Sequence, residues 1–158
     1  MTPRKELFIR IKEALMEIPE IELVDLERGQ MQNDLFPELL VSALVKISKI
    51  SYETMTEQNQ EGMASVDVVL YCRDGWRNQH GGTEDPEHGL SEIDLLDSIA
   101  EKLQFLEGEQ FTPLQQTEDE TEVQAMEGIF SYRQSFSTMI YRRLAPRFKP
   151  QKININIK

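Results

Sequence analysis

Residues 39–55 read LLVSALVKISKISYETM, and residues 62–74 read GMASVDVVLYCRD. Both stretches are rich in Val, Ile, Leu and Tyr, residue types that favour an extended chain. The segment between them, TEQNQE at 56–61, has the polar composition of a turn. We therefore predict two long strands that pair as an antiparallel hairpin.

Alternation within these strands predicts which side chains are buried. The second strand places four apolar residues on one face: Val66, Val68, Leu70 and Cys72. Cys72 is therefore expected to be a buried structural thiol and not a nucleophile. In the first strand a constant period of two places Ile47 on one face and Ile50 on the other.

Two amphipathic helices are predicted outside the hairpin. Thr2 and Pro3 are typical of a helix start. Apolar residues then recur every three or four positions, and Pro19 ends this helical pattern. A second helix is predicted over 90–107, with Gly108 in the position that often follows a helix end.

Three further segments complete the predicted order. A strand is expected at 21–27, a short strand at 109–114 and a long last strand around 128–141, with 115–124 as an acidic loop between the last two. The order is α-β-β-β-α-β-β. We therefore predict an α+β fold, with a mainly antiparallel sheet and both helices packed on one face.

The chain length of 158 residues predicts one domain. We place that domain at 1–145, with a mobile, glycine-rich insertion at 74–89 and a basic C-terminal arm at 146–158. The insertion carries the only tryptophan, Trp76, which we interpret as an interface anchor.

Charge is segregated along the chain. Residues 1–127 hold all 28 acidic residues and 10 basic ones, a net charge of −18, whereas 128–158 hold seven basic residues and no acid. A net charge of −11 argues against sequence-specific nucleic-acid binding, which needs a basic face. No apolar run reaches the length of a membrane span, so no membrane partner is expected. The single cysteine excludes an internal disulfide.

The C-terminal arm combines positive charge with an alternating apolar pattern, which is typical of a segment that adds to a sheet edge in its own chain or in a neighbour. The predicted interface residues come from the insertion and from the basic segment 142–158: Trp76, Arg142, Arg143, Arg147, Ile153, Ile155 and Ile157.

The sequence leaves two other functions open. His80, Asp85 and His88 lie within one loop and have the side chains of a metal-dependent hydrolase. Their spacing matches no standard zinc pattern, so we predict no catalytic residue, no metal and no cofactor. The other alternative is an adaptor module that binds a partner peptide at a sheet edge.

The layout over residues 4–141 resembles the tail terminator, or tail-completion, proteins of long-tailed bacteriophages and prophages. The segments that carry the resemblance are Ile18-Pro19, Phe36-Pro37, Leu39–Met55, Val66–Tyr71, the helix start Leu90–Asp94, and Glu127–Phe136. The loop at 74–89 and the basic arm depart from the family pattern.

This resemblance implies a non-enzymatic subunit that assembles with itself into a ring, usually a hexamer. Such a ring caps the tail tube and joins it to the head, so the implied partners are the tail tube protein and the head–tail connector. The implied location is the virion tail, and the cytoplasm of the bacterial host during assembly.

Overall fold

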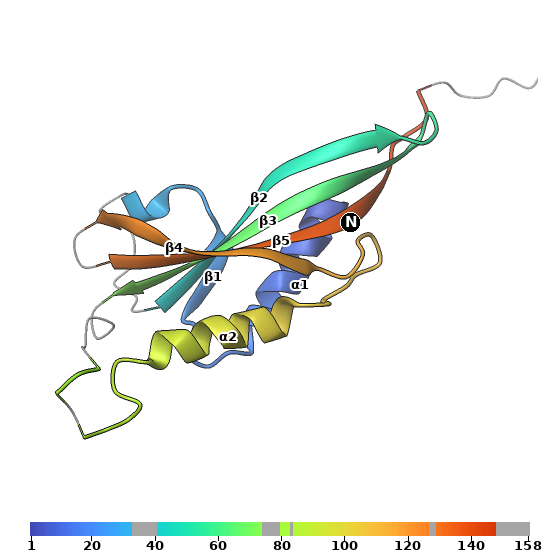
Figure 1. Cartoon of the computed structure of the whole chain (residues 1–158). Coiled ribbons are helices and arrows are strands. Elements are labelled where there is room, and N and C mark those ends of the chain that lie inside the picture. The colour runs from blue at the N-terminus through green and yellow to red at the C-terminus, as the bar shows by residue number, and fades with distance from the viewer. Residues whose placement is uncertain (33–40, 74–79, 83, 127–128, 148–158) are drawn as a thin grey trace, which may run out of the picture.

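The computed structural model describes residues 1–32, 41–73, 80–82, 84–126 and 129–147 (Figure 1). In chain order its elements are α1 Pro3–Met16, β1 Leu23–Leu26, the 3-10 turn η1 Gln30–Gln32, β2 Val41–Thr54, β3 Asn59–Arg73, α2 Ser91–Leu103, β4 Gln115–Met126 and β5 Ile129–Arg143.

The strands form one sheet in the order β1-β2-β3-β5-β4. β1 runs parallel to β2, and the other three pairings are antiparallel. The predicted α+β fold, its α-β-β-β-α-β-β order and its mainly antiparallel sheet are confirmed. The hairpin predicted from residues 39–74 is the β2–β3 pair at the centre of the sheet.

Both helices cover the same face of the sheet (Figure 1). One apolar cluster joins Leu7, Ile11 and Leu15 of α1 to Leu95 and Ile99 of α2. The sheet supplies the residues predicted for the buried face of β3, together with two from β5: Val66, Val68, Leu70, Cys72, Phe136 and Ile140. On the opposite face, Met31 of η1 packs against Leu44 and Ile129 in a small second cluster, and neither α1 nor α2 lies there.

The alternation predicted for β2 is wrong beyond Ile47. A β-bulge places two β2 residues against one β3 residue: Ile47 pairs with Val66, but the next pair joins Lys49 to Ser65. The extra residue shifts the period of two by one position. Ile50 therefore packs against the same core as Ile47, and not on the opposite face.

The acidic loop predicted at 115–124 is wrong, because this segment is β4. β4 is an edge strand, so its acidic side chains can reach solvent while its main chain pairs with β5. The short strand predicted at 109–114 is reduced to a single bridge between Phe111 and Ile140.

The second helix ends at Leu103, earlier than predicted, and Gly108 does not follow its end. Phe105 takes the left-handed conformation, with φ of 65°, and reverses the chain. Gly108 is instead needed for close packing: a Cβ there would lie 2.3 Å from Phe111 Cε1 and 2.7 Å from Glu6 Oε1.

Cys72 is fully buried, as predicted, and burial raises the pKa of its thiol from 9.0 to about 12, with a smaller contribution from the Glu92 carboxylate. In the unfolded chain the thiol loses its proton above its ordinary pKa, whereas in the folded chain it keeps it. Stability is therefore expected to fall as pH rises from about 9 toward 12, by at most about 1.4 kcal/mol per pH unit.

This prediction is checked by urea unfolding at a series of alkaline pH values, in the wild type and in Cys72→Ala. The alanine variant is less stable at neutral pH but should lose less stability as the pH rises. An identical alkaline slope in the two proteins would contradict the prediction.

Candidate functional site

The face of the sheet opposite the helices, which we call the open face, carries a row of polar side chains that crosses four strands. The strand register places Lys46 of β2, Asp67 of β3, Ser135 of β5 and Glu118 of β4 side by side. Alternation in β5 places Arg133 on the same face. The four strands β2, β3, β5 and β4 thus present one polar row, with a basic residue at one end and acidic residues at the other.

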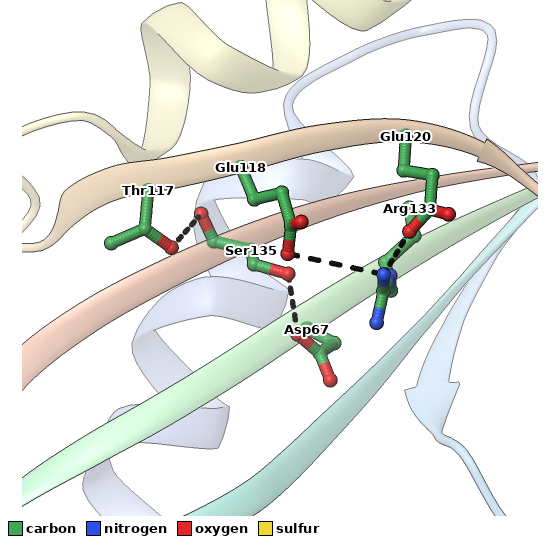
Figure 2. Close-up of polar contacts among 6 residues, drawn as sticks. All are labelled: Asp67, Thr117, Glu118, Glu120, Arg133 and Ser135. Carbon is green, nitrogen blue, oxygen red and sulfur yellow. Dashed lines mark hydrogen bonds and ion pairs between the residues drawn. The ribbon is translucent and has the colours of Figure 1, made fainter.

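Arg133 is the centre of the acidic side of this surface (Figure 2). Its Nη2 binds Glu120 Oε2 and lies 3.9 Å from Glu118 Oε2. The hydrogen bond from Arg133 to the Glu120 carboxylate raises the pKa of the guanidinium, which stays charged. Because all three side chains are partly exposed, these pairs align β4 on β5 more than they stabilise the fold.

A second set of contacts ties three strands together beside the arginine. Ser135 Oγ donates to Asp67 Oδ1 over 2.6 Å, and Thr117 Oγ1 donates to the Ser135 carbonyl oxygen over 3.2 Å (Figure 2). The serine hydroxyl is thus bound to a carboxylate from the neighbouring strand. This arrangement holds β3, β4 and β5 in register.

The far ends of β2, β3 and β5 extend beyond the helices as a three-stranded ribbon (Figure 1). It carries exposed apolar side chains: Met55, Met63, Tyr141 and Leu144. A cavity of about 480 Å³ lies here, lined by Met55, Thr56, Asn59, Gln60, Gln110, Tyr141, Arg142 and Arg143. Exposed apolar surface of this kind is typical of a site where another protein binds.

The predicted interface arginines lie at the end of this ribbon. Arg142 and Arg143 are the last residues of β5. The Arg142 guanidinium stacks 4.1 Å from the centre of the Tyr52 ring, and its Nε donates to Gln60 Oε1 over 3.2 Å. Arg147 follows β5 and lines a separate cavity of about 390 Å³.

Four of the predicted interface residues lie outside the described residues: Trp76, Ile153, Ile155 and Ile157. The polar row of the open face was not singled out from the sequence. The alternation of β5 did carry a signal for it, since Arg133 and Ser135 are two residues apart.

The loop that carries the alternative metal site, with His80, Asp85 and His88, does not bring these side chains together as ligands. His80 Nδ1 lies 2.9 Å from the carbonyl oxygen of His88, and the Glu87 amide donates to Asp85 Oδ1 over 2.9 Å. These contacts are made to the main chain. Within the described ranges, no three His, Cys, Asp or Glu side chains gather as they would around a metal ion.

No helix of the described part of the chain has the length and apolar character needed to cross a membrane. No known family model and no curated protein matches the sequence. One solved structure, "Virion of native gene transfer agent (GTA) particle", contains a chain with a similar fold. The match has a TM-score of 0.61 and covers 88% of this chain and 97% of that chain, at 5% sequence identity. At this identity the match shows a shared fold.

Proposed function

We propose that this chain is a structural subunit of a phage-like particle and that it acts as a tail terminator. Copies of the chain form a ring that caps the tail tube and joins it to the head–tail connector. The observation that carries the proposal is the extent of the structural match. The shared fold covers 88% of this chain and 97% of the chain from the gene transfer agent virion.

The surface of the subunit also supports assembly. The sheet ends in two edge strands, and its ribbon exposes Met55, Met63 and Tyr141. Unpaired edges and exposed apolar side chains are liabilities in a monomer but are covered when subunits associate. A subunit of a closed ring would bury such surfaces against its neighbours.

The charge of the chain suits a ring through which DNA passes. Residues 1–127 have a net charge of −18. An acidic lining repels phosphate and does not hold the passing DNA, whereas a basic lining would bind it.

We propose a non-enzymatic role for the polar groups of the open face. Glu118 and Glu120 bind Arg133, and Ser135 binds Asp67. These groups are paired across neighbouring strands, which is what a sheet-stabilising network requires. The rival is a metal-dependent hydrolase built on His80, Asp85 and His88.

The proposal is tested by the mass and shape of the purified protein. A hexameric ring of 18.4 kDa chains is expected at about 110 kDa by light scattering, with a central opening in electron micrographs. Such rings should bind the ends of purified tail tubes of the same particle. Metal analysis of the purified protein tests the hydrolase alternative. One bound metal ion per chain that is lost in His80→Ala/His88→Ala would favour the hydrolase. A monomer that binds no tube would contradict the terminator.

The basic arm is predicted to strengthen this self-association. Deletion of residues 146–158 should leave a folded body but weaken assembly, because the apolar side chains of the arm would lose their contacts with a neighbour. Ile155→Asp should have nearly the same effect. Sedimentation as a function of protein concentration measures the change, with circular dichroism as the control for folding. An unchanged concentration dependence in the truncated protein would show that the arm has no part in assembly.

A further inference from the structure

The outer edge of β4 is open to a further strand between Thr117 and Thr121. β4 is the last strand on its side of the sheet, as far as the structure describes the chain. At Gln116 the edge is occupied, because the amide of this residue donates to the Gln104 side chain over 2.8 Å. Every residue from Thr117 to Thr121 is exposed. This stretch can therefore form main-chain hydrogen bonds with another extended segment.

The α2 helix lies alongside this edge on the helix-covered face of the sheet. The Asp119 side chain is on this side, because its Oδ2 lies 3.4 Å from Gln134 Nε2. The same nitrogen donates to the carbonyl oxygen of Leu96 in α2 over 3.0 Å. Leu96 is thus tied to β5, and Gln104 is tied to β4. One flank of the helix therefore faces the outer edge of β4.

That flank of α2 is apolar and incompletely covered. It consists of three residues that lie on the same side of the helix as Gln104, at spacings of three and four: Ile93, Leu96 and Ala100. Ile93 is 53% exposed, and Leu96 and Ala100 are half-buried. A strand added to β4 would place every second side chain against this flank. Apolar residues at alternate positions of that strand would therefore become buried.

The open-face side of the same edge is acidic. Glu118 and Glu120 lie on the open face, where both carboxylates bind Arg133 (Figure 2). Two carboxylates share one guanidinium, so this side of the edge keeps a net negative charge. The other alternate side chains of an added strand would meet these glutamates, and basic residues would be favoured there.

The sequence of the C-terminal arm fits both sides of this edge. Residues 152–158 read KININIK and lie outside the described residues. In an extended chain the three isoleucines share one face, and Lys152 and Lys158 share the other with two asparagines. Ile153 to Ile157 span about 13 Å in a strand, and the α2 flank spans about 10 Å along its helix. The isoleucine face therefore matches the flank in polarity and length, and the lysine face matches the glutamates.

The arm that reaches this edge must come from another copy of the chain. The described residues end at Arg147, beside the β2–β3 turn at the far end of the ribbon (Figure 1). Leu144 pairs with this turn and lies ten residues along β5 from Gln134, the partner of Asp119, a distance of about 33 Å. From Arg147 to Ile155 the chain has eight residues, which span at most about 29 Å. Ile155 therefore cannot reach Asp119 of its own chain.

We propose that the C-terminal arm of one copy adds as a strand to the β4 edge of the next copy, with its isoleucines against α2 and its lysines over Glu118 and Glu120. This inference rests on the proposed ring, and it names the surface that holds the arm. Each copy gives one arm and receives one, so the contact is head-to-tail and can close into a ring.

The competing site for the arm is the outer edge of β2 beyond Val45, where the pairing with β1 ends. Lys46 and Lys49 are exposed on the open face of that edge. They would repel the lysines of the arm, whereas the glutamates of β4 attract them. Charge therefore favours the β4 edge.

Two full-length variants separate the arm from the surface that receives it. Ile155→Asp should disable the arm, and Ile93→Asp should disable the α2 flank. Each alone should self-associate at least about tenfold more weakly than the wild type, because a charge replaces an apolar side chain that assembly buries. Met16→Asp, at an exposed apolar position of α1, is the control and should assemble normally. Circular dichroism checks that each variant is folded.

Mixing the two variants tests the head-to-tail contact. The arm of Ile93→Asp is intact, and so is the α2 flank of Ile155→Asp. At a concentration where neither variant associates alone, an equimolar mixture should form dimers of two 18.4 kDa chains, about 37 kDa by light scattering. A mixture that stays monomeric would contradict the pairing of this arm with this flank.

Charge reversal in the arm identifies the edge. In Lys152→Glu/Lys158→Glu the arm would repel the two glutamates of β4, so self-association should weaken about tenfold. At the β2 edge the same change would strengthen self-association, because the exposed lysines there would attract the new carboxylates. The control Lys5→Glu/Lys12→Glu makes the same charge change on exposed positions of α1 and should assemble normally.

A cross-link shows whether the arm comes from a neighbour. In Ile155→Cys/Asp119→Cys a short bismaleimide, which also bridges adjacent positions along a strand, should join chains into a ladder. Cys72 is fully buried, so the wild type should give no ladder under the same conditions. A monomer linked within itself would show that the arm folds back on its own chain and would overturn the inference.

The outcomes separate this inference from the proposed function. Wild-type rings together with an Ile93→Asp variant that assembles normally would overturn the β4 site and leave the ring standing. Rings that Lys152→Glu/Lys158→Glu strengthens would move the arm to the β2 edge and also overturn the inference. A wild-type protein that stays monomeric at its highest soluble concentration would overturn both the ring and the arm contact.

Discussion

Glu6→Ala is expected to lower the free energy of unfolding by about 3–5 kcal/mol, because it removes a buried carboxylate that accepts two main-chain hydrogen bonds. Glu6 lies in the first turn of α1 and is only 6% exposed. Its Oε1 accepts from the Glu109 amide over 2.8 Å, and its Oε2 accepts from the Gln110 amide over 3.0 Å. The variant leaves both amides without this partner and detaches the segment after α2 from α1.

Urea unfolding followed by circular dichroism measures this change. Glu6→Gln keeps one acceptor oxygen and should recover part of the lost stability. The matched control is Glu13→Ala, an exposed position on the same helix, which should change the unfolding free energy by less than about 0.5 kcal/mol. Equal effects at positions 6 and 13 would show that the carboxylate of Glu6 does not hold this segment.

Phe136→Ala is expected to destabilise the protein by a similar amount, about 3–5 kcal/mol, because it leaves a cavity at the centre of the core. Phe136 is 1% exposed and lies in the middle of β5, where it pairs with Val66 of β3 and Gln116 of β4. It packs in the cluster that joins both helices to the sheet. Its loss removes contacts that neighbouring side chains cannot fully replace.

The size of the cavity can be varied to test this explanation. Phe136→Leu removes fewer atoms and should cost less than Phe136→Ala in the same urea experiment. Tyr141→Ala removes a large ring from the same strand at an exposed position and should leave unfolding nearly unchanged. A Tyr141→Ala effect as large as that of Phe136→Ala would contradict the assignment of the core to the helix-covered face.

The long periodic segments could be predicted from the sequence because their patterns are local. Val66, Val68, Leu70 and Cys72 lie on the buried face of β3, where alternation placed them. Thr2 caps α1, with its side chain 3.4 Å from the Lys5 amide. In these elements the chain's own geometry decides which side chains point together, so the period of the pattern is sufficient.

The tertiary structure alone decided the positions where distant segments meet. Nothing in the local pattern distinguishes Glu6 from Glu13, yet the chain near residue 109 folds against only the first of them. Gly108 matched a helix end in the sequence but is needed because Phe111 and Glu6 leave no room for a Cβ. The acidic segment at 115–124 has the composition of a loop, and pairing with β5 makes it a strand.

The polar row of the open face likewise depends partly on the sequence and partly on the tertiary structure. The sequence by itself determined the α+β order, the pairing of β2 with β3 and the segregation of charge toward the C-terminus. The sheet order decided that Lys46 and Glu118 stand at opposite ends of one row on one face. The physical reason is that this row depends on pairings between strands far apart in the chain, and on two bulges that change the phase of alternation within them.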